Sequence, residues 1–397
     1  METVIFHIDV NNAFLSWEAL YRLQVLGEKL DLRTIPSAIA GDKESRHGII
    51  LAKSMPAREY GVQTAETIGD ALKKCPNLML VPTRKHIYKQ YSQRLMSLLH
   101  EYSATIEKFS IDEAFADMTD TPLLCQYAEP QKAADALRRT IYERLGFTVN
   151  IGVSSNKLLA KMASDFKKPN RTHTLFLEEI QEKMWPLPIR DLLFVGRSTE
   201  QRLYNLGIRT IGELANFDCD VICSHLGKHG KMIHNYANGV DESPVTSEVA
   251  ESKGYGNSTT VSHDVTDVYE AKKILSSLCD TVGERLRKDE VMAGSIAVSI
   301  KYATFVRNSH QCTLDTPTDN TQEIYQYVCA LFDECWNGQP IRLLGVATGK
   351  ITRERIRQLT LFDHEKNEKK EKLNSAIGDI RKKFGNDAIM PASSLHQ

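Results

Sequence analysis

Residues 106–118 read IEKFSIDEAFADM and place two adjacent carboxylates, Asp112 and Glu113, between two short segments that favour β-structure. This pattern predicts a β-hairpin with both acids at its bend. A third carboxylate, Asp9, lies at the end of residues 4–10, VIFHIDV, which predict a buried strand. Acids among apolar residues are costly to bury unless something neutralises them. A pair of divalent cations would do so, and the alternative is that each acid caps a turn or pairs with a lysine or arginine.

The composition is that of an ordinary globular protein. The chain has 397 residues, 42% of them hydrophobic, and its 50 Lys and Arg against 51 Asp and Glu give a net charge of −1. At roughly 100–200 residues per domain the length predicts several domains, and the charge balance gives no support for a nucleic-acid partner. No apolar run approaches the roughly 18–20 residues of a membrane span, and the N-terminus lacks signal-peptide features. The eight cysteines form no CxxC pair, which favours reduced thiols in the cytoplasm.

The order of the predicted elements indicates an α+β protein. Apolar spacing predicts helices and strands over residues 13–27 (helix), 37–52 (two strands), 84–102 (helix), 132–145 (helix) and 149–153 (strand). We expect a further helix to open at Ser154 and run to about Phe166. Residues 242–253 are polar and Ser-rich, which predicts a linker. From residue 254 to about 352 the order βαββαβ predicts a small two-layer domain.

Basic side chains gather in three segments of the first half of the chain. They are Arg58, Arg84, Lys85, Lys157, Lys161, Lys167, Lys168 and Arg171. Such a set could clamp a triphosphate or a nucleic-acid backbone. For most of them, however, we expect a solvated surface, because Lys157 and Lys161 have the i, i+4 spacing of one exposed helix face.

A helical hairpin is expected at residues 195–214, with the turn LGI around Gly207. Backbone amides at the start of a second helix can bind a phosphate of DNA. A second glycine-containing turn, LGKHGK at residues 226–231, carries Lys228 and Lys231. Many helical hairpins bind nothing, so this motif alone leaves its function open.

The segment QLTLF, Gln358 to Phe362, places apolar side chains in a highly charged tail. Such a peptide can anchor Leu359, Leu361 and Phe362 in a partner's pocket. The alternative is that it docks on the core of its own chain.

Taken together, these motifs resemble those of the Y-family (translesion) DNA polymerases of the bacterial polymerase IV type. The resemblance runs from residue 4 to about 352. It rests on FHIDVNNAF (6–14), FSIDEAFADM (109–118), NIGVSSNKLLAKMASDFKKPN (150–170) and FVGRSTEQRLYNLGIRTIGELA (194–215). Motifs of this length in this order favour the metal interpretation of the acids.

The resemblance implies error-prone, template-directed DNA synthesis across damaged template, with roles in DNA repair, replication, the SOS response and mutagenesis. Asp9, Asp112 and Glu113 would be catalytic and would hold two Mg²⁺ ions, with Mn²⁺ able to substitute. The Val10 carbonyl would complete the nucleotide-side site. One ion would activate the primer 3′-hydroxyl and the other would balance charge on pyrophosphate.

By the same resemblance Phe14 would be the steric gate that excludes the 2′-hydroxyl of a ribonucleotide. Arg58, Tyr88 and Lys168 would contact the triphosphate or the sugar. Gly207, Lys228 and Lys231 would contact the DNA backbone. The residues Gln358, Leu359, Leu361 and Phe362 would bind the sliding clamp.

Three positions depart from the family pattern. Met55 stands where the family often has a tyrosine, so a phosphate hydrogen bond is missing or comes from Lys53 or Ser54. Asn11 and Asn12 stand where many relatives carry an acid and an aromatic residue. These departures bear on triphosphate affinity and lesion preference.

The implied fold is an α+β, multidomain right hand that acts as a monomer. Its parts would be a ferredoxin-like palm (1–12 and 84–175), fingers (13–83), a helix-hairpin-helix thumb (176–241), a linker (242–253), a βαββαβ little finger (254–351) and a tail (352–397). Its partners would be primer–template DNA, dNTPs and the sliding clamp (β subunit), held through QLTLF. Two alternatives are a nucleotide cyclase with a related palm and a non-catalytic adaptor that binds DNA or the clamp.

Overall fold

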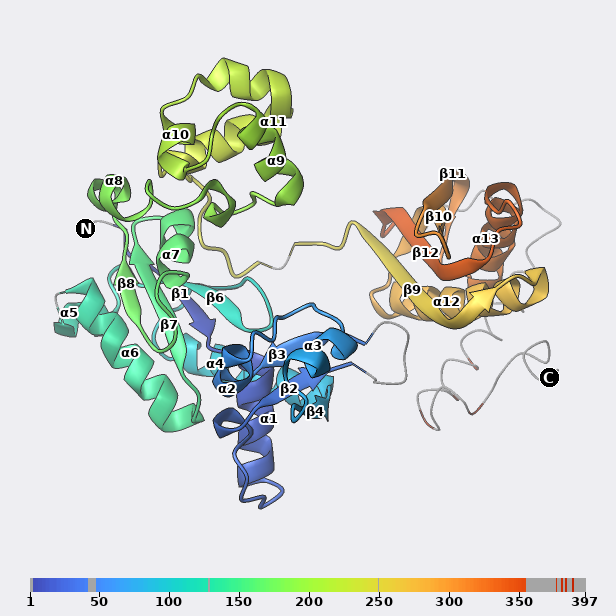
Figure 1. Ribbon diagram of the computed structural model, residues 1–397. Helices are drawn as coiled ribbons and strands as arrows, with labels where there is room; N and C mark the ends of the chain where they lie inside the picture. Colours follow the sequence, from blue (N-terminus) through green and yellow to red (C-terminus); the bar gives the residue numbers. More distant parts are fainter. Residues whose placement is uncertain are drawn as a thin grey trace. The chain divides into compact units, whose positions relative to one another are not determined.

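The computed structural model describes residues 3–41, 48–127, 129–248 and 250–354, with a few single residues beyond them (Figure 1). They divide into two compact units, the described residues up to 248 and those from 250 onward. Among the helices described, none is long and apolar enough to cross a membrane. The QLTLF segment, residues 358–362, lies outside the described residues.

A five-stranded sheet with the order β5-β6-β1-β7-β8 forms the centre of the first unit. Its strands are β1 (Ile5–Val10), β5 (Ile106–Lys108), β6 (Glu113–Asp117), β7 (Val149–Ser154) and β8 (Thr172–Thr174). β1 pairs antiparallel with β6 and β7, whereas β7 and β8 are parallel. Every residue of β1 and β7 is buried, which explains their nearly continuous apolar sequences.

The two faces of this sheet are covered by different helices. These are α1 (Ala13–Gln24), α4 (Lys85–His100), α5 (Pro122–Tyr127), α6 (Pro130–Leu145) and α7 (Lys157–Ser164). Phe6, Ile8 and Val10 share a core with α1, α4 and α6. Because side chains alternate along a strand, His7 and Asp9 face the other side, which α7 covers. Asp9 therefore lies between the sheet and α7.

A smaller sheet, β3-β2-β4, follows α1 along the chain. Its elements are β2 (Ser37–Ala40), β3 (Ile50–Lys53), α2 (Met55–Glu59), α3 (Ile68–Lys74), β4 (Met79–Pro82) and a 3-10 helix (Leu32–Thr34). The sequence predicted β2 and β3 but not the short, partly exposed edge strand β4. The helix expected from Ser154 begins instead at Lys157, because the Asn156 side chain accepts from the Leu159 N–H and caps it there.

A helical segment completes the first unit. It contains α8 (Ile180–Lys183), α9 (Arg197–Asn205), α10 (Ile211–Ala215), α11 (Cys219–Ala237) and 3-10 helices at Leu177–Glu179 and Ile189–Asp191. The predicted hairpin is confirmed: Gly207 has φ 84° in the turn between α9 and α10. The second predicted turn is a break within α11, where Gly227 has φ 61°.

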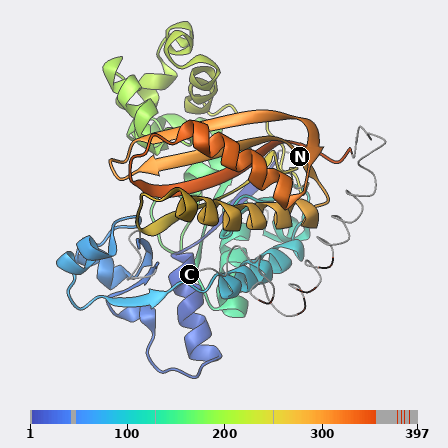
Figure 2. The same ribbon diagram turned by 90° about the vertical axis from the view of Figure 1, so that its right-hand side faces the viewer.

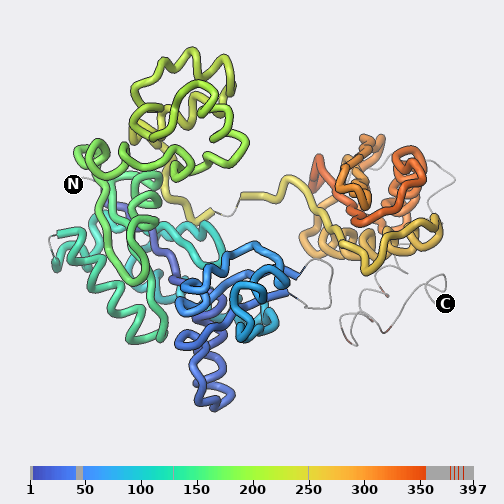
Figure 3. The backbone as a smooth tube through the Cα atoms, viewed as in Figure 1, coloured from blue at the N-terminus to red at the C-terminus, as the bar shows by residue number. Residues whose placement is uncertain are grey.

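The second unit has the predicted βαββαβ order and one antiparallel sheet, β11-β10-β12-β9. Figure 3 traces its backbone from yellow to red along the chain. Its elements are β9 (Gly254–Val265), α12 (Val268–Lys288), β10 (Met292–Tyr302), β11 (Arg307–Thr318), α13 (Thr321–Cys335) and β12 (Ile341–Thr352). α12 and α13 lie side by side on one face of the sheet (Figure 2). The expectation of an α+β protein is thus confirmed.

Candidate active site

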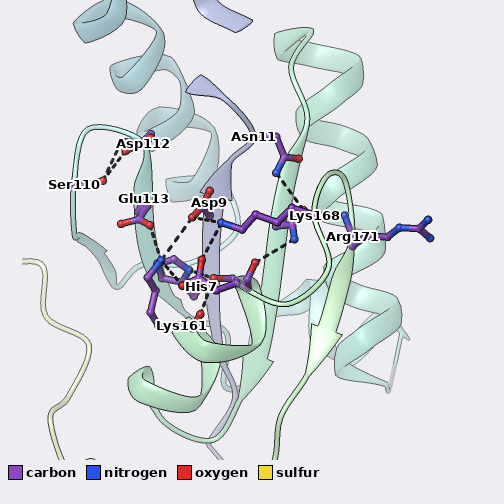
Figure 4. A network of polar contacts seen from close by, with 12 residues as sticks. His7, Asp9, Asn11, Ser110, Asp112, Glu113, Lys161, Lys168 and Arg171 are labelled. Atoms are coloured by element: carbon purple, nitrogen blue, oxygen red, sulfur yellow. Dashed lines mark hydrogen bonds and ion pairs between the residues drawn. The ribbon is translucent and has the colours of Figure 1, made fainter. Parts of the chain in front are cut away.

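The three acidic residues lie at one end of the central sheet (Figure 4). In the β1–β6 pairing Asp9 lies opposite Glu113, and the Val10 N–H donates to the Asp112 carbonyl at 3.0 Å. Asp9 is only 8% exposed, whereas Asp112 and Glu113 are half-buried. The Ser110 hydroxyl donates to the Asp112 carboxylate at 2.8 Å. Residues more than a hundred positions apart in the sequence are therefore neighbours here.

Two lysines lie between these acids. The Lys161 ammonium lies 2.6 Å from the Glu113 carboxylate, 3.1 Å from Asp165 and 3.6 Å from Asp9. The Lys168 ammonium lies 2.9 Å from both Asp9 and Asp165. Asp9 and Glu113 thus have internal counter-charges, and Asp165 joins the two lysines.

The expectation that Lys161 belongs to a solvated helix face is wrong, since this side chain is buried. Lys157 is also not free in solvent, because its ammonium lies 2.8 Å from Glu107. The helix KLLAKMAS contains the signal that was missed: residues 158–163 are apolar on every side except at Lys161. A helix that is apolar all round is buried, and a lysine within it needs an anionic partner.

The charges in this cluster are not fully balanced at Asp9. Burial, opposed by Lys168, raises the pKa of Asp9 to about 6. Burial by itself lowers the pKa of Lys161 and of Lys168, but the surrounding carboxylates outweigh it and raise both pKa values. Both lysines therefore remain cationic at neutral pH.

The donor set suits a hard divalent cation. Within the described ranges no three His, Cys, Asp or Glu side chains already form a closed metal cage. Asp9, Asp112 and Glu113 nevertheless offer carboxylate oxygens at one strand end, and oxygen is the ligand that Mg²⁺ prefers. The buried, incompletely neutralised carboxyl of Asp9 would gain from an added positive charge.

Gly152 on β7 allows α7 to approach the sheet this closely. A Cβ atom at this position would lie 1.9 Å from the Ala160 carbonyl oxygen and 2.5 Å from the Ser164 nitrogen. The close approach lets the Ser164 hydroxyl hydrogen-bond the His7 ring at 2.8 Å. It also brings Lys161, on the same helix, to the carboxylates.

We expect Gly152→Ala to destabilise the fold by about 1–3 kcal/mol, because the added methyl group collides with helix backbone rather than with a movable side chain. The free energy of unfolding in urea measures this cost. Gly69→Ala is the control, since its Cβ would meet nothing closer than the Thr67 hydroxyl at 3.9 Å. That variant should be stabilised by roughly 0.5–1 kcal/mol, and equal effects at the two glycines would contradict the argument.

Phe14 lies on the first turn of α1 and is half-buried. Its ring stacks on that of Tyr88, with centroids 4.8 Å apart and planes inclined by 13°. Tyr88 itself is 1% exposed, and burial raises its pKa to about 12. The structure therefore places Tyr88 behind Phe14, and Phe14 is the ring of this pair that solvent reaches.

The other residues singled out in the sequence lie on separate elements. Arg58 and Met55 are exposed on α2. Ser54 is buried and its hydroxyl accepts from the Ala57 N–H, whereas Lys53 is half-buried. In the helical segment of the first unit the side chains of Lys228 and Lys231 are exposed on α11.

Comparisons with known proteins agree with this architecture. Residues 8–165 match the impB/mucB/samB family, residues 252–361 its C-terminal domain and residues 178–208 its HHH motif. A chimeric Y-family DNA polymerase of known structure, 23% identical, has the same fold, with a TM-score of 0.75 over 88% of this chain and 100% of its own.

Curated relatives match over nearly their whole length. DNA polymerase IV of Clostridium acetobutylicum is 43% identical over 100% of this chain and 99% of its own. DNA polymerase IV of Clostridium kluyveri is 38% identical over 100% of this chain and 98% of its own. DNA polymerase IV 1 of Bacillus subtilis is 35% identical over 99% of this chain and 93% of its own. The chain therefore belongs to the impB/mucB/samB family of Y-family DNA polymerases, of the DNA polymerase IV type.

Proposed function

We propose that this chain copies damaged DNA templates by two-metal-ion transfer of a nucleotide from a dNTP to a primer 3′-hydroxyl. The observation that carries the proposal is the pairing of Asp9 with Glu113, next to Asp112, at one end of the central sheet. Relatives named as polymerases over the full length favour this function over a cyclase or a non-catalytic adaptor.

Asp9, Asp112, Glu113 and the Val10 carbonyl are the groups that would hold two Mg²⁺ ions, with Mn²⁺ as a substitute. Bound there, the ions would lower the pKa of the primer hydroxyl and balance charge on the leaving pyrophosphate. The chain supplies the anionic oxygens and orients them through the β1–β6 pairing. The side chain of Lys168 is 34% exposed, so it can be reached by a nucleotide. Its ammonium would leave Asp9 and bind the triphosphate instead.

The nucleotide would lie over Phe14, with its triphosphate toward Arg58 and Lys168. Tyr88 would not contact the nucleotide itself. Its ring, stacked on the far side of Phe14, would keep the Phe14 ring from moving away from the sugar. An aromatic ring held in this position leaves no room for a 2′-hydroxyl. dNTPs would therefore be selected over rNTPs by exclusion.

We assign the palm to residues 1–12 and 84–175, the fingers to 13–83, the thumb to 176–241, the linker to 242–253 and the little finger to 254–351. The thumb would bind the DNA backbone at Gly207, Lys228 and Lys231, through N–H groups at a helix start and cationic side chains. In the little finger the sheet face opposite α12 and α13 carries small residues, Ser299 and Gly345 among them, in register. A flat face of this kind suits close approach to DNA.

The eight cysteines are free thiols, which supports a reducing cytoplasm as the site of action. A monomer would suffice, since the proposed palm, fingers and thumb all belong to one chain.

Primer extension on paired templates, one undamaged and one carrying a defined base lesion, tests the proposed function. With Mg²⁺ and dNTPs we expect full extension of the first and continued synthesis past the lesion in the second. If the protein copies undamaged DNA normally but stops opposite every lesion tried, it is a DNA polymerase without translesion activity, and the proposed translesion role is contradicted.

Deletion of residues 358–362 is expected to abolish stimulation by the sliding clamp, because the apolar anchors of QLTLF would be lost. Distributive synthesis without the clamp should be unchanged, since none of these residues belongs to the proposed active site. Product length per binding event, measured with and without clamp, separates the two. Undiminished clamp stimulation of the deletion variant would assign the segment another role.

A further inference from the structure

The buried Asn150, on β7 behind the active site, uses every hydrogen-bonding position of its side chain. Its Nδ2 donates to the backbone carbonyls of Ser164, at 3.1 Å, and Lys167, at 3.2 Å. Its Oδ1 accepts from the backbone N–H of Arg171, at 3.1 Å, and from the Nδ2 of Asn11, at 3.2 Å. A single side chain thus binds both ends of the loop that carries Lys168.

Asn11, directly after β1, completes this arrangement (Figure 4). Its Oδ1 accepts from the backbone N–H of Asn170 at 2.8 Å. The backbone N–H of Asn11 donates to the Thr148 carbonyl at 2.9 Å. Asn11 is buried, two residues beyond Asp9. The amide pair therefore fastens the Lys168 loop to the strand end that carries the acidic cluster.

With Asn150 in place, residue 11 has to be able both to donate and to accept a hydrogen bond. Asn150 cannot turn its amide over, because three of its partners are backbone groups whose donor or acceptor character is fixed. Its oxygen must therefore face residue 11, which has to donate to it while accepting from the Asn170 N–H. A carboxamide does both, whereas an ionised carboxylate has no hydrogen to donate.

We propose that Asn11 and Asn150 are positioning residues that set the place of Lys168 for nucleotide binding. The inference rests on the proposed contact between Lys168 and the triphosphate. The Lys168 side chain has rotatable bonds, so its backbone must be held if the ammonium is to meet a phosphate without a large loss of freedom. Because the amide pair holds this loop in place, the backbone of Lys168 is already fixed before the nucleotide binds.

The test compares Asn11→Asp with Lys168→Ala in the full-length chain on undamaged primer–template DNA. For Asn11→Asp we expect the KM for dNTP to rise roughly tenfold, the effect of losing one buried hydrogen bond, while kcat changes less than about twofold. Hydrogen exchange of the Asn170 and Arg171 amides should accelerate, a readout that needs neither metal nor catalysis. Thermal unfolding shows whether each variant is folded.

A second variant tests the donor requirement itself. Asn150→Thr supplies a hydroxyl that can donate to a carboxylate, so in that background Asn11→Asp should raise KM less than in the wild-type background. Equal penalties of Asn11→Asp in both backgrounds would contradict a specific amide pair. If Asn11→Asp does not fold, Asn11→Ala removes the same two side-chain hydrogen bonds without adding charge, and the KM for dNTP and the exchange of the Asn170 amide are then measured on that variant.

The possible failures can be told apart. If Lys168→Ala raises the KM for dNTP but Asn11→Asp leaves both KM and amide exchange unchanged, the positioning role is overturned. If Lys168→Ala itself has no effect on KM, the proposed nucleotide contact of Lys168 falls instead.

Discussion

Simultaneous Asp112→Ala and Glu113→Ala substitution is expected to reduce primer extension roughly a thousandfold or more, because it removes two of the three carboxylates proposed to hold the metal ions. Without these oxygens the metal ions would not be held. The pKa of the primer hydroxyl would then not be lowered, and the negative charge on the leaving pyrophosphate would not be balanced. The chain should still fold, since Lys161 keeps Asp165 as an ion-pair partner at 3.1 Å. Single-turnover extension rates measure the effect.

Two controls make this result specific. Asp117→Asn changes an acid on the same strand, whose carboxylate accepts from the Thr119 N–H rather than facing Asp9, and it should extend primers normally. Binding of primer–template DNA by the double variant should match that of the wild-type protein. Extension by the double variant within tenfold of wild type would remove the proposed catalytic role of both acids.

Phe14→Ala is expected to raise ribonucleotide insertion roughly a hundredfold relative to deoxynucleotide insertion, the scale on which a shaped pocket discriminates between closely related substrates. Removal of the ring opens the space that a 2′-hydroxyl needs, and the buried Tyr88 behind it is too deep to fill that space. The ratio of kcat/KM for a dNTP and the matching rNTP measures the change. An unaltered ratio would show that another group excludes the ribose.

Tyr88→Phe is the matched control for this prediction. It keeps the stacked ring, whose centroid is 4.8 Å from that of Phe14, and removes only the buried hydroxyl. Sugar selectivity should stay at the wild-type level. A loss of selectivity in Tyr88→Phe would mean that the hydroxyl, rather than the ring behind Phe14, supports discrimination.

The features predicted from the sequence are those encoded locally. Alternation and turn residues indicated the acidic hairpin, Gly207 indicated the turn between two helices, and apolar spacing gave the βαββαβ order of the second unit. The short edge strand β4 escaped prediction because strand propensity is weak over a few half-exposed residues. The start of α7 was misplaced because a capping side chain, rather than periodicity, decides it.

The buried partners of the active site became visible only in three dimensions. The sequence shows which residue types are available: three acids in strand-like surroundings, a lysine in an apolar helical segment and a glycine in the segment before it. Tertiary structure alone decided that Lys161 meets Glu113, that Gly152 admits α7 and that Asn11 bonds to Asn150. Helix and strand periods act over a few neighbouring residues. The Lys161–Glu113 and Asn11–Asn150 contacts, however, join side chains 48 and 139 positions apart and depend on strand register, and the Gly152 contact depends on how α7 packs on the sheet.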